Sequence, residues 1–223
     1  MASASSPDRG AGADGERAVG VGPWPGGPAA WPADDRYDPA LLADGDRRNV
    51  ADRYRYWRVE AVRADLDRSR AGVHVAVENW RHDLNIGSVV RTANAVNAAG
   101  VHVVGHRRWN RRGAMVTDRY LHVHHHADAA ALAAWAATAG LPVLGVDNVP
   151  GAVPLETHDL PERVVLLLGQ EGTGLTAGAL AVCDAVLAIH QAGSTRSVNA
   201  GAAAAIALHA WVRRHVFGQL PGG

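Results

Sequence analysis

The sequence of 223 residues contains a single cysteine and no lysine. One cysteine, Cys183, excludes both a disulfide framework and a cysteine-rich zinc site. No apolar run reaches the roughly 20 residues that a membrane-spanning helix needs. The N-terminal segment also lacks a basic stretch followed by an apolar one, so we expect a cytoplasmic protein with no membrane partner.

Because lysine is missing, arginine supplies all the formal positive charge. The chain holds 22 basic and 22 acidic residues, and its formal net charge is zero. A neutral chain does not bind nucleic acid through overall charge, although this balance permits local basic patches. The planar fork of arginine suits phosphate and carboxylate groups, whereas a coding bias toward arginine explains the same composition without any function.

The composition changes twice along the chain. Residues 1–35 are rich in Gly, Pro, Ala, Ser and Asp, which predicts a disordered N-terminal tail. Residues 36–70 are expected to form an N-terminal helical extension, in which Asp46 caps a helix that runs to about Arg70. One face of this helix is apolar and the other is rich in arginine. We favour a solvated arginine face over one that contacts RNA.

Residues 71–223 alternate between short apolar runs and helical patterns. Continuous apolar runs are typical of parallel strands that are buried on both faces, and intervening helices supply the crossovers. The sequence therefore predicts an α/β fold, with a mostly parallel sheet and helices on both faces. The expected strands are 73–77, 101–104, 142–146, 164–168 and 185–189, and the expected helices are 86–99, 127–139, 177–182 and 197–216.

Three junctions between a strand and a helix carry glycines and polar residues. They span residues 85–91, 168–175 and 189–199. Ligands of open α/β sheets bind beyond the carboxyl ends of the strands, so we expect the three junctions to form one shared site. The middle junction lacks the G-x-G-x-x-G spacing and the later acidic residue of a dinucleotide site, which argues against a dehydrogenase.

The residue types in these junctions indicate anion binding. Gly87 and Arg91 lie one helical turn apart on one face, and an arginine there could grip a phosphate with two hydrogen bonds. In the last junction, Ser197 is expected to cap the final helix, with Asn199 in its first turn. Gly193 lets a ligand approach the main chain closely.

In this order, the motifs resemble those of the SPOUT superfamily, in its TrmH (SpoU) branch of RNA ribose 2′-O-methyltransferases. That branch carries N-x-G-x-x-x-R, then G-x-E-x-x-G-L, then I-P-M-x-G-x-x-x-S-L-N, and the resemblance covers about residues 73–215. This chain departs from the pattern in the third motif. His190-Gln191 replaces Pro-Met, Val198 replaces Leu, and Ala200-Gly201 replaces Val-Ser. The Gln form is similar to that of some tRNA guanosine methylases of the branch.

The resemblance implies a C-terminal trefoil knot, an exception to the rule that chains do not thread. It also implies a homodimer and S-adenosylmethionine bound in the knot, largely by main-chain groups. The activity it implies is methyl transfer from S-adenosylmethionine to a ribose 2′-hydroxyl of tRNA or rRNA. The matching cofactor positions are Val146, Gly169, Ile189, Gln191, Gly193, Ser197 and Val198.

The resemblance also implies a catalytic role for Arg91. Because arginine keeps its proton below a pH of about 12, we expect Arg91 to clamp a phosphate and stabilise alkoxide charge rather than act as a base. Asn85, Ser197 and Asn199 would orient the ribose and Arg91, and Glu171 would anchor the glycine-rich loop. The alternative is a catalytically silent RNA-binding module of the same fold.

The segment after the second expected strand gathers arginines around a tryptophan. Arginine grips phosphates and tryptophan stacks on bases, so we expect this segment to contact RNA. A solvated loop held by salt bridges is the alternative. Together with one arginine of the last junction, the expected RNA-binding residues are Arg107, Arg108, Trp109, Arg111, Arg112 and Arg196.

Four histidines cluster at positions 122, 124, 125 and 126. In a strand, only His122, His124 and His126 would share a face. Beyond Asp128, no cysteine and no nearby pair of carboxylates supports a metal site at these histidines. We therefore expect a surface strand of histidines and no metal site.

Overall fold

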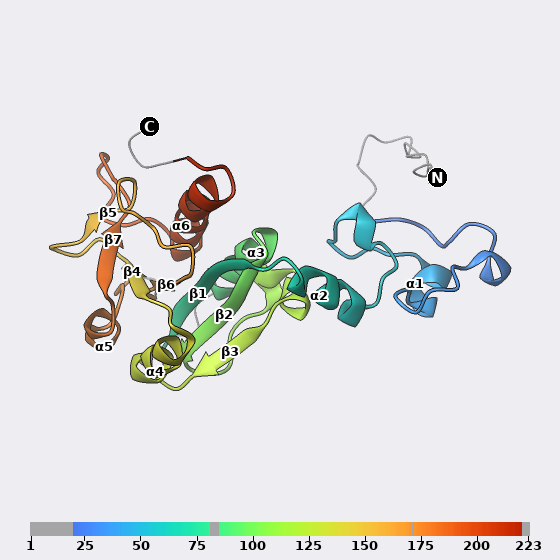
Figure 1. Cartoon of the computed structure of the whole chain (residues 1–223), viewed down its shortest axis with the longest axis horizontal. Coiled ribbons are helices and arrows are strands. Elements are labelled where there is room, and N and C mark those ends of the chain that lie inside the picture. Colours follow the sequence, from blue (N-terminus) through green and yellow to red (C-terminus); the bar gives the residue numbers. More distant parts are fainter. Residues whose placement is uncertain (1–19, 81–84, 171, 220–223) are drawn as a thin grey trace. The chain divides into compact units, whose positions relative to one another are not determined.

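The computed structural model describes residues 20–80, 85–170 and 172–219 of the chain (Figure 1). The chain divides into two compact units, residues 1–62 and residues 63–223. The division lies at 62/63, whereas the sequence led us to expect a boundary at 70/71. Within the described residues, no helix has the length and apolar content needed to cross a membrane.

The described residues of the first unit form turns, three short helices and a cluster of aromatic rings. Its helices are η1 (Pro28–Ala30), α1 (Pro39–Asp44) and η2 (Asp52–Tyr54). The Trp24 ring packs edge-on against Tyr37 and Tyr56, with centroid distances of 5.8 and 5.3 Å. The sequence predicted a disordered tail over residues 1–35, whereas within residues 20–35 the structure describes the helix η1 and these contacts of Trp24. Residues 1–19 lie outside the described part of the chain.

A buried carboxylate replaces the helix cap that the sequence predicted at Asp46. Asp46 is fully buried and pairs with the Arg48 guanidinium at 2.6 Å. Its carboxylate also accepts the backbone N–H of Tyr56 at 2.9 Å. Burial by itself would raise the pKa of Asp46, but the hydrogen bonds from Arg48 and the Tyr56 backbone bring it below its ordinary value.

The helix expected from Asp46 to Arg70 is consequently interrupted. Tyr56 has a φ of 63°, in the left-handed region that a helix excludes. Tyr37 pairs with Trp57 in an antiparallel bridge. Before this bridge the segment forms only the single turn η2, and its α-helix, α2 (Val59–Asp67), follows the bridge. The apolar spacing was correct for α2, but the Asp46 contacts decide the rest of the segment.

The second unit contains one sheet of seven strands, in the order β3-β2-β1-β6-β4-β7-β5. All its neighbouring pairs are parallel. The structure thus confirms the predicted parallel sheet and adds the two-residue strand β5. The strands are β1 (Ala71–Asn79), β2 (Ala98–Gly105), β3 (Val123–His126), β4 (Val143–Val146), β5 (Val153–Pro154), β6 (Val164–Leu168) and β7 (Ala185–Ala188).

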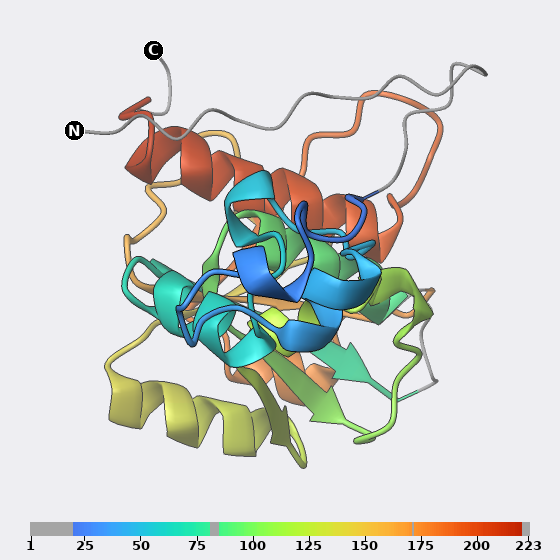
Figure 2. The same cartoon turned by 90° about the vertical axis from the view of Figure 1, so that its right-hand side faces the viewer.

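Helices cover both faces of the sheet, as predicted. Val75 and Leu166 point to one face, where they pack against α3 (Asn85–Ala95) and α6 (Ala200–His215). Ala76 points to the other face, toward α4 (Ala129–Ala139) and α5 (Ala177–Ala181). Figure 2 shows α6 and α4 on opposite sides of the strands. Alternate residues of each strand therefore feed two separate cores.

Two helix ends differ from expectation. The helix expected over 86–99 ends at Ala95, and Gly100 lies in β2 rather than at a helix cap. Asn97 explains the early end, since its φ is 53° and its side-chain amide donates to the Ser69 carbonyl at 2.9 Å. The last helix begins at Ala200 rather than at Ser197. By contrast, α4 ends at Gly140, as predicted.

A ladder of histidines crosses three neighbouring strands beneath Trp135 of α4. His102 of β2 is fully buried and lies directly opposite His124 of β3. Its two ring nitrogens contact His74 at 3.1 Å and His126 at 2.9 Å. The Trp135 ring centroid lies 4.1 Å from that of His102. His124 and His126 thus pack against a buried imidazole, while β3 itself is largely exposed, as predicted for a surface strand.

These contacts keep the imidazoles neutral. Burial, followed by repulsion from the neighbouring histidines, lowers the pKa of His102 to about 2 from its ordinary 6.5. Burial lowers the pKa of His74 to about 4, with smaller contributions from His124 and Arg163. Protonation of a buried imidazole is costly because the folded state offers no compensating anion in the ladder.

We predict that the ladder makes folding stability depend on pH. The folded pKa of His102 lies below 6.5, so the unfolded chain binds protons first as the pH falls. Below pH about 6.5, the free energy of unfolding therefore falls by about 1.4 kcal/mol per pH unit for each such histidine. The free energy of unfolding of the wild type and of His102→Gln is measured by denaturant titration between pH about 6.5 and about 5. The wild type should lose stability more steeply, by about this amount per pH unit. Equal slopes in the two proteins would refute the assignment.

Candidate active site

The carboxyl ends of four strands lie level at one edge of the sheet. Val77 of β1 pairs with Leu168 of β6, and Leu168 pairs with Val146 of β4. Val146 in turn pairs with Leu187 of β7. The segments that follow these strands therefore meet at this edge, and among them are the three junctions that the sequence singled out.

The last two junctions and the end of β4 enclose a cleft of about 530 Å³. Six of the seven expected cofactor positions line it, while Gly193 is exposed and lies outside the lining. Glu171, expected to anchor the loop, lies outside the described residues. The lining residues are Val146, Asp147, Asn148, Val149, Leu168, Gly169, Gln170, Gly172, Thr173, Gly174, Ile189, Gln191, Arg196, Ser197, Val198, Asn199, Ala200 and Ala203.

A glycine pair fixes the path of the middle junction. A Cβ atom on Gly169 would lie 2.1 Å from the carbonyl carbon of Gly174, so no side chain fits at position 169. Gly174 has a φ of 68°, and its N–H donates to the Gln170 carbonyl at 3.1 Å. The loop therefore folds back onto the end of β6, and its backbone forms one wall of the cleft.

Two carboxylates hold this loop, and the sequence analysis missed both. Asp147, directly after β4, accepts the N–H of Leu175 at 2.7 Å. Glu78, in β1 and fully buried, accepts the N–H and the hydroxyl of Thr176 at 2.8 and 2.7 Å. It also accepts the indole N–H of Trp80 at 3.0 Å. The available signal was an acidic residue at the end of an apolar strand, which backbone N–H groups satisfy here.

The first and last junctions meet through a pair of asparagines. The Asn199 side-chain amide donates to the Asn85 side-chain oxygen at 2.8 Å. The Asn199 oxygen accepts the N–H groups of Gly201 and Ala202 at 2.9 and 3.2 Å. Asn199 is therefore the N-cap of α6, and the prediction that Ser197 caps it is wrong. Ser197 precedes the cap by two residues and lines the cleft.

Glycines also bring α3 close to its neighbours. A Cβ on Gly87 would lie 2.7 Å from the Cα of Gly113, in the short helix η3 (Arg112–Ala114). A Cβ on Gly201 would lie 3.1 Å from the Ser88 Cβ. The close approach at Gly87 is thus to the chain itself. Arg91, one turn later, is exposed on α3 and does not line the cleft.

The arginine-rich segment begins at the same edge of the sheet. The Asn79 side-chain amide, at the end of β1, donates to the carbonyls of His106 and Arg108 at 2.5 and 2.9 Å. Trp109 is half-buried and packs against the core, and the Arg111 guanidinium lies 5.5 Å from its ring centroid. The four expected arginines of this segment are exposed, namely Arg107, Arg108, Arg111 and Arg112. Arg196, the remaining expected RNA contact, lines the cleft.

Comparisons with known proteins agree on one family. The profile of the SpoU rRNA methylase family matches residues 72–209. A tRNA (guanosine(18)-2′-O)-methyltransferase of Escherichia coli (strain K12) is 29% identical over 147 residues, which are 65% of this chain and 64% of that protein. An uncharacterized tRNA/rRNA methyltransferase of Synechocystis is 30% identical, over 74% of this chain and 44% of that protein. The chain thus spans less than two thirds of the length of these relatives.

A solved structure shares the fold. The SpoU methyltransferase AviRb of Streptomyces viridochromogenes, in complex with the cofactor AdoMet, is 26% identical with a TM-score of 0.59. This match covers 70% of this chain and 62% of that one. The family profile covers more than half of the chain, in the unit that holds the parallel sheet and the three junctions. The chain therefore belongs to the SpoU rRNA methylase family.

Proposed function

We propose that this protein transfers a methyl group from S-adenosylmethionine to a ribose 2′-hydroxyl of tRNA or rRNA. The supporting observation is that the last two junctions line one cleft. The hydrogen bond between Asn85 and Asn199 holds the first junction at the edge of this cleft. The proposal includes a cytoplasmic homodimer and a C-terminal trefoil knot. The alternative, an RNA-binding module without turnover, predicts cofactor or RNA binding but no methylated product.

The described lining fits S-adenosylmethionine. Main chain from Gly169 and the apolar residues Ile189 and Val198 form much of it, and only Asp147 and Arg196 are charged among the lining residues. Apolar walls with few polar groups suit an adenine ring, whose edge backbone groups can bind. When bound, the cofactor supplies a methyl group on a sulfonium, which is already a good leaving group.

The protein then has to position the ribose and help its hydroxyl lose a proton. Asn199 is held from two sides, by the first turn of α6 and by Asn85, and is rigid enough to orient a ribose. Arg91 is exposed on the helix that Asn85 begins. We assign it the clamp on the adjacent phosphate. Its positive charge stabilises the developing alkoxide, and the hydroxyl proton passes to water rather than to Arg91.

Loss of the Asp147 carboxylate should weaken cofactor binding. Asp147→Ala leaves the N–H of Leu175 without its acceptor, and the loop wall of the cleft loosens. We expect the affinity for S-adenosylmethionine to fall about tenfold, or about 1.4 kcal/mol, in a calorimetric titration. Asp147→Asn keeps one acceptor oxygen, so its affinity for S-adenosylmethionine should lie between those of the wild type and Asp147→Ala.

The matched control for this experiment is Asp159→Ala, which removes an exposed carboxylate paired with Arg214. It should bind cofactor as the wild type does. Folding of each variant is checked by its unfolding midpoint. A folded Asp147→Ala protein with unchanged affinity would show that the loop holds its shape without this carboxylate.

Removal of Arg91 should separate binding from chemistry. Arg91 does not line the cleft, so Arg91→Ala should bind S-adenosylmethionine normally. Its turnover on RNA should fall by about 10²- to 10³-fold, because the alkoxide loses its electrostatic partner. Arg213→Ala, an exposed arginine in the last turn of α6, serves as the control. Unchanged turnover in Arg91→Ala would remove this residue from the mechanism.

The proposed homodimer uses the outer face of α6. Ala202, Ile206 and His209 are exposed at helical spacing on one face, and Ile206 is 41% exposed. Ile206→Asp should shift sedimentation toward the monomer, because a carboxylate would be buried without a partner. His209→Asn is the control on the same face. A wild-type protein that sediments as a monomer would refute the dimer itself.

A further inference from the structure

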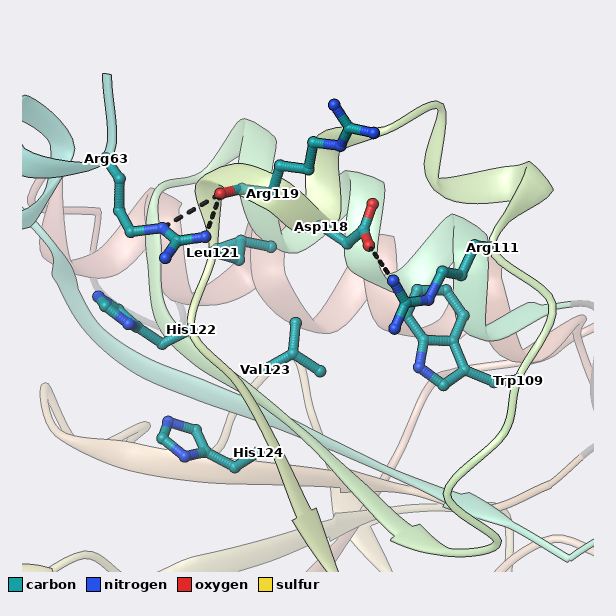
Figure 3. A pocket seen from close by; sticks show the side chains of 9 residues that line it. All are labelled: Arg63, Trp109, Arg111, Asp118, Arg119, Leu121, His122, Val123 and His124. Atoms are coloured by element: carbon teal, nitrogen blue, oxygen red, sulfur yellow. Dashed lines mark hydrogen bonds and ion pairs between the residues drawn. The ribbon is translucent and has the colours of Figure 1, made fainter. Parts of the chain in front are cut away.

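A second hollow, separate from the cleft, lies at the β3 edge of the sheet. Its volume is about 430 Å³, and it shares no lining residue with the cleft. In Figure 3, Arg63 and His122 lie on one side, and Trp109 stacked with Arg111 lies on the other, with Leu121 and Val123 between them. The lining residues are Arg63, Trp109, Arg111, Asp118, Arg119, Leu121, His122, Val123 and His124.

The charge around this hollow is positive although the chain is neutral overall. Three guanidinium groups line it, from Arg63, Arg111 and Arg119, against the single carboxylate of Asp118. Arg111 pairs with Asp118 at 3.3 Å, and its side chain stays 74% exposed. A second carboxylate, Asp67, binds the His122 imidazole at 2.9 Å just beyond the lining.

Arg63 and Arg119 keep charges that no carboxylate neutralises in the described part of the chain. The Arg63 Nε donates to the main-chain carbonyl of Arg119 at 3.1 Å. A neutral carbonyl fixes the guanidinium in place but leaves its charge uncompensated. The Arg119 side chain is exposed and makes no ion pair among the described residues. One guanidinium group held in place and a second exposed one, both uncompensated, are suited to an anionic ligand.

The hollow is continuous with the arginine segment that begins at the edge of the cleft. Asn79 fixes that segment at His106 and Arg108, close to where β1 ends. Arg107 and Arg108 are exposed in this segment. The next residues along it, Trp109 and Arg111, form one wall of the hollow. Positively charged side chains therefore extend from the carboxyl edge of the sheet to β3. A polymeric anion can contact this whole stretch, whereas a small anion can contact only part of it.

We propose that this hollow binds the phosphodiester backbone of the substrate RNA, away from the ribose that is methylated. The inference rests on the proposed function, since it assumes that RNA is the substrate. Arg119 and Arg63 supply the phosphate contacts, which position the RNA without reading its bases.

The test compares Arg119→Gln, Arg63→Gln and the double variant on whichever tRNA or rRNA transcript the wild type methylates. The affinity for RNA should fall on the order of tenfold in the double variant at moderate salt. The slope of log affinity against log salt should become shallower by about 1 for each arginine removed. At saturating RNA, kcat should be unchanged, and so should the affinity for S-adenosylmethionine.

Arg163→Gln is the matched control, because Arg163 is exposed, does not line the hollow, and like Arg63 donates to a main-chain carbonyl, that of Ala139. It should keep the wild-type salt slope. Arg63→Gln could unfold because it loses its hydrogen bond to the Arg119 carbonyl. In that case the RNA affinity of Arg119→Gln alone tests the proposal, since the Arg119 carbonyl, and not its side chain, makes this hydrogen bond.

The outcomes separate the two proposals. A wild type that neither binds S-adenosylmethionine nor methylates RNA overturns the proposed function. An active wild type, with variants of unchanged RNA affinity and salt slope, overturns only the inference about the hollow. Binding of poly-glutamate that the variants lose, while their RNA affinity is unchanged, would assign the hollow to an acidic protein and equally overturn it.

Discussion

The contact between Gly169 and Gly174 is the constraint on which the cleft depends. A side chain at position 169 would lie 2.1 Å from the neighbouring backbone, so the loop can fold back onto β6 only without one. This fold places the N–H groups of Leu175 and Thr176 where Asp147 and Glu78 accept them. The ends of the strands lie level at one edge of the sheet. The glycine pair, Asp147 and Glu78 hold the loop against this edge, where its backbone forms a wall of the cleft.

Asn199 joins the local structure of one motif to the position of another. One side-chain oxygen caps α6, and the amide nitrogen of the same side chain binds Asn85 at the start of α3. The ends of two helices that lie far apart in the sequence are thus fixed by a single side chain. Residues of the first and last motifs can act together because the cap and the contact are the same group, so a change at Asn199 alters helix stability and site geometry at once.

The sheet and the convergence of the motifs could be predicted because they follow from local signals. Continuous apolar runs such as Val164–Leu168 have one favourable environment, a strand covered on both faces. The features that were missed depend on side-chain contacts that the local sequence pattern does not show. Asp46 reads as a helix cap until Arg48 and Tyr56 enclose it, and Asn97 ends α3 through a contact with Ser69. The exposure of β3 was predicted, but the local pattern does not show that β2 places the buried His102 beneath its histidines.

Net neutrality conceals a separation of charge within the sheet-containing unit. The cleft lining is almost free of charged side chains, with Asp147 engaged by backbone N–H groups. Exposed arginines instead follow the segment from β2 to the β3 edge. A neutral cleft lets main-chain groups bind a ligand without competition from strong charges, whereas phosphate binding gains from uncompensated guanidinium groups. In a chain of zero net charge, both requirements are met because some arginines, such as Arg63 and Arg119, lie where no carboxylate of the described residues pairs with them.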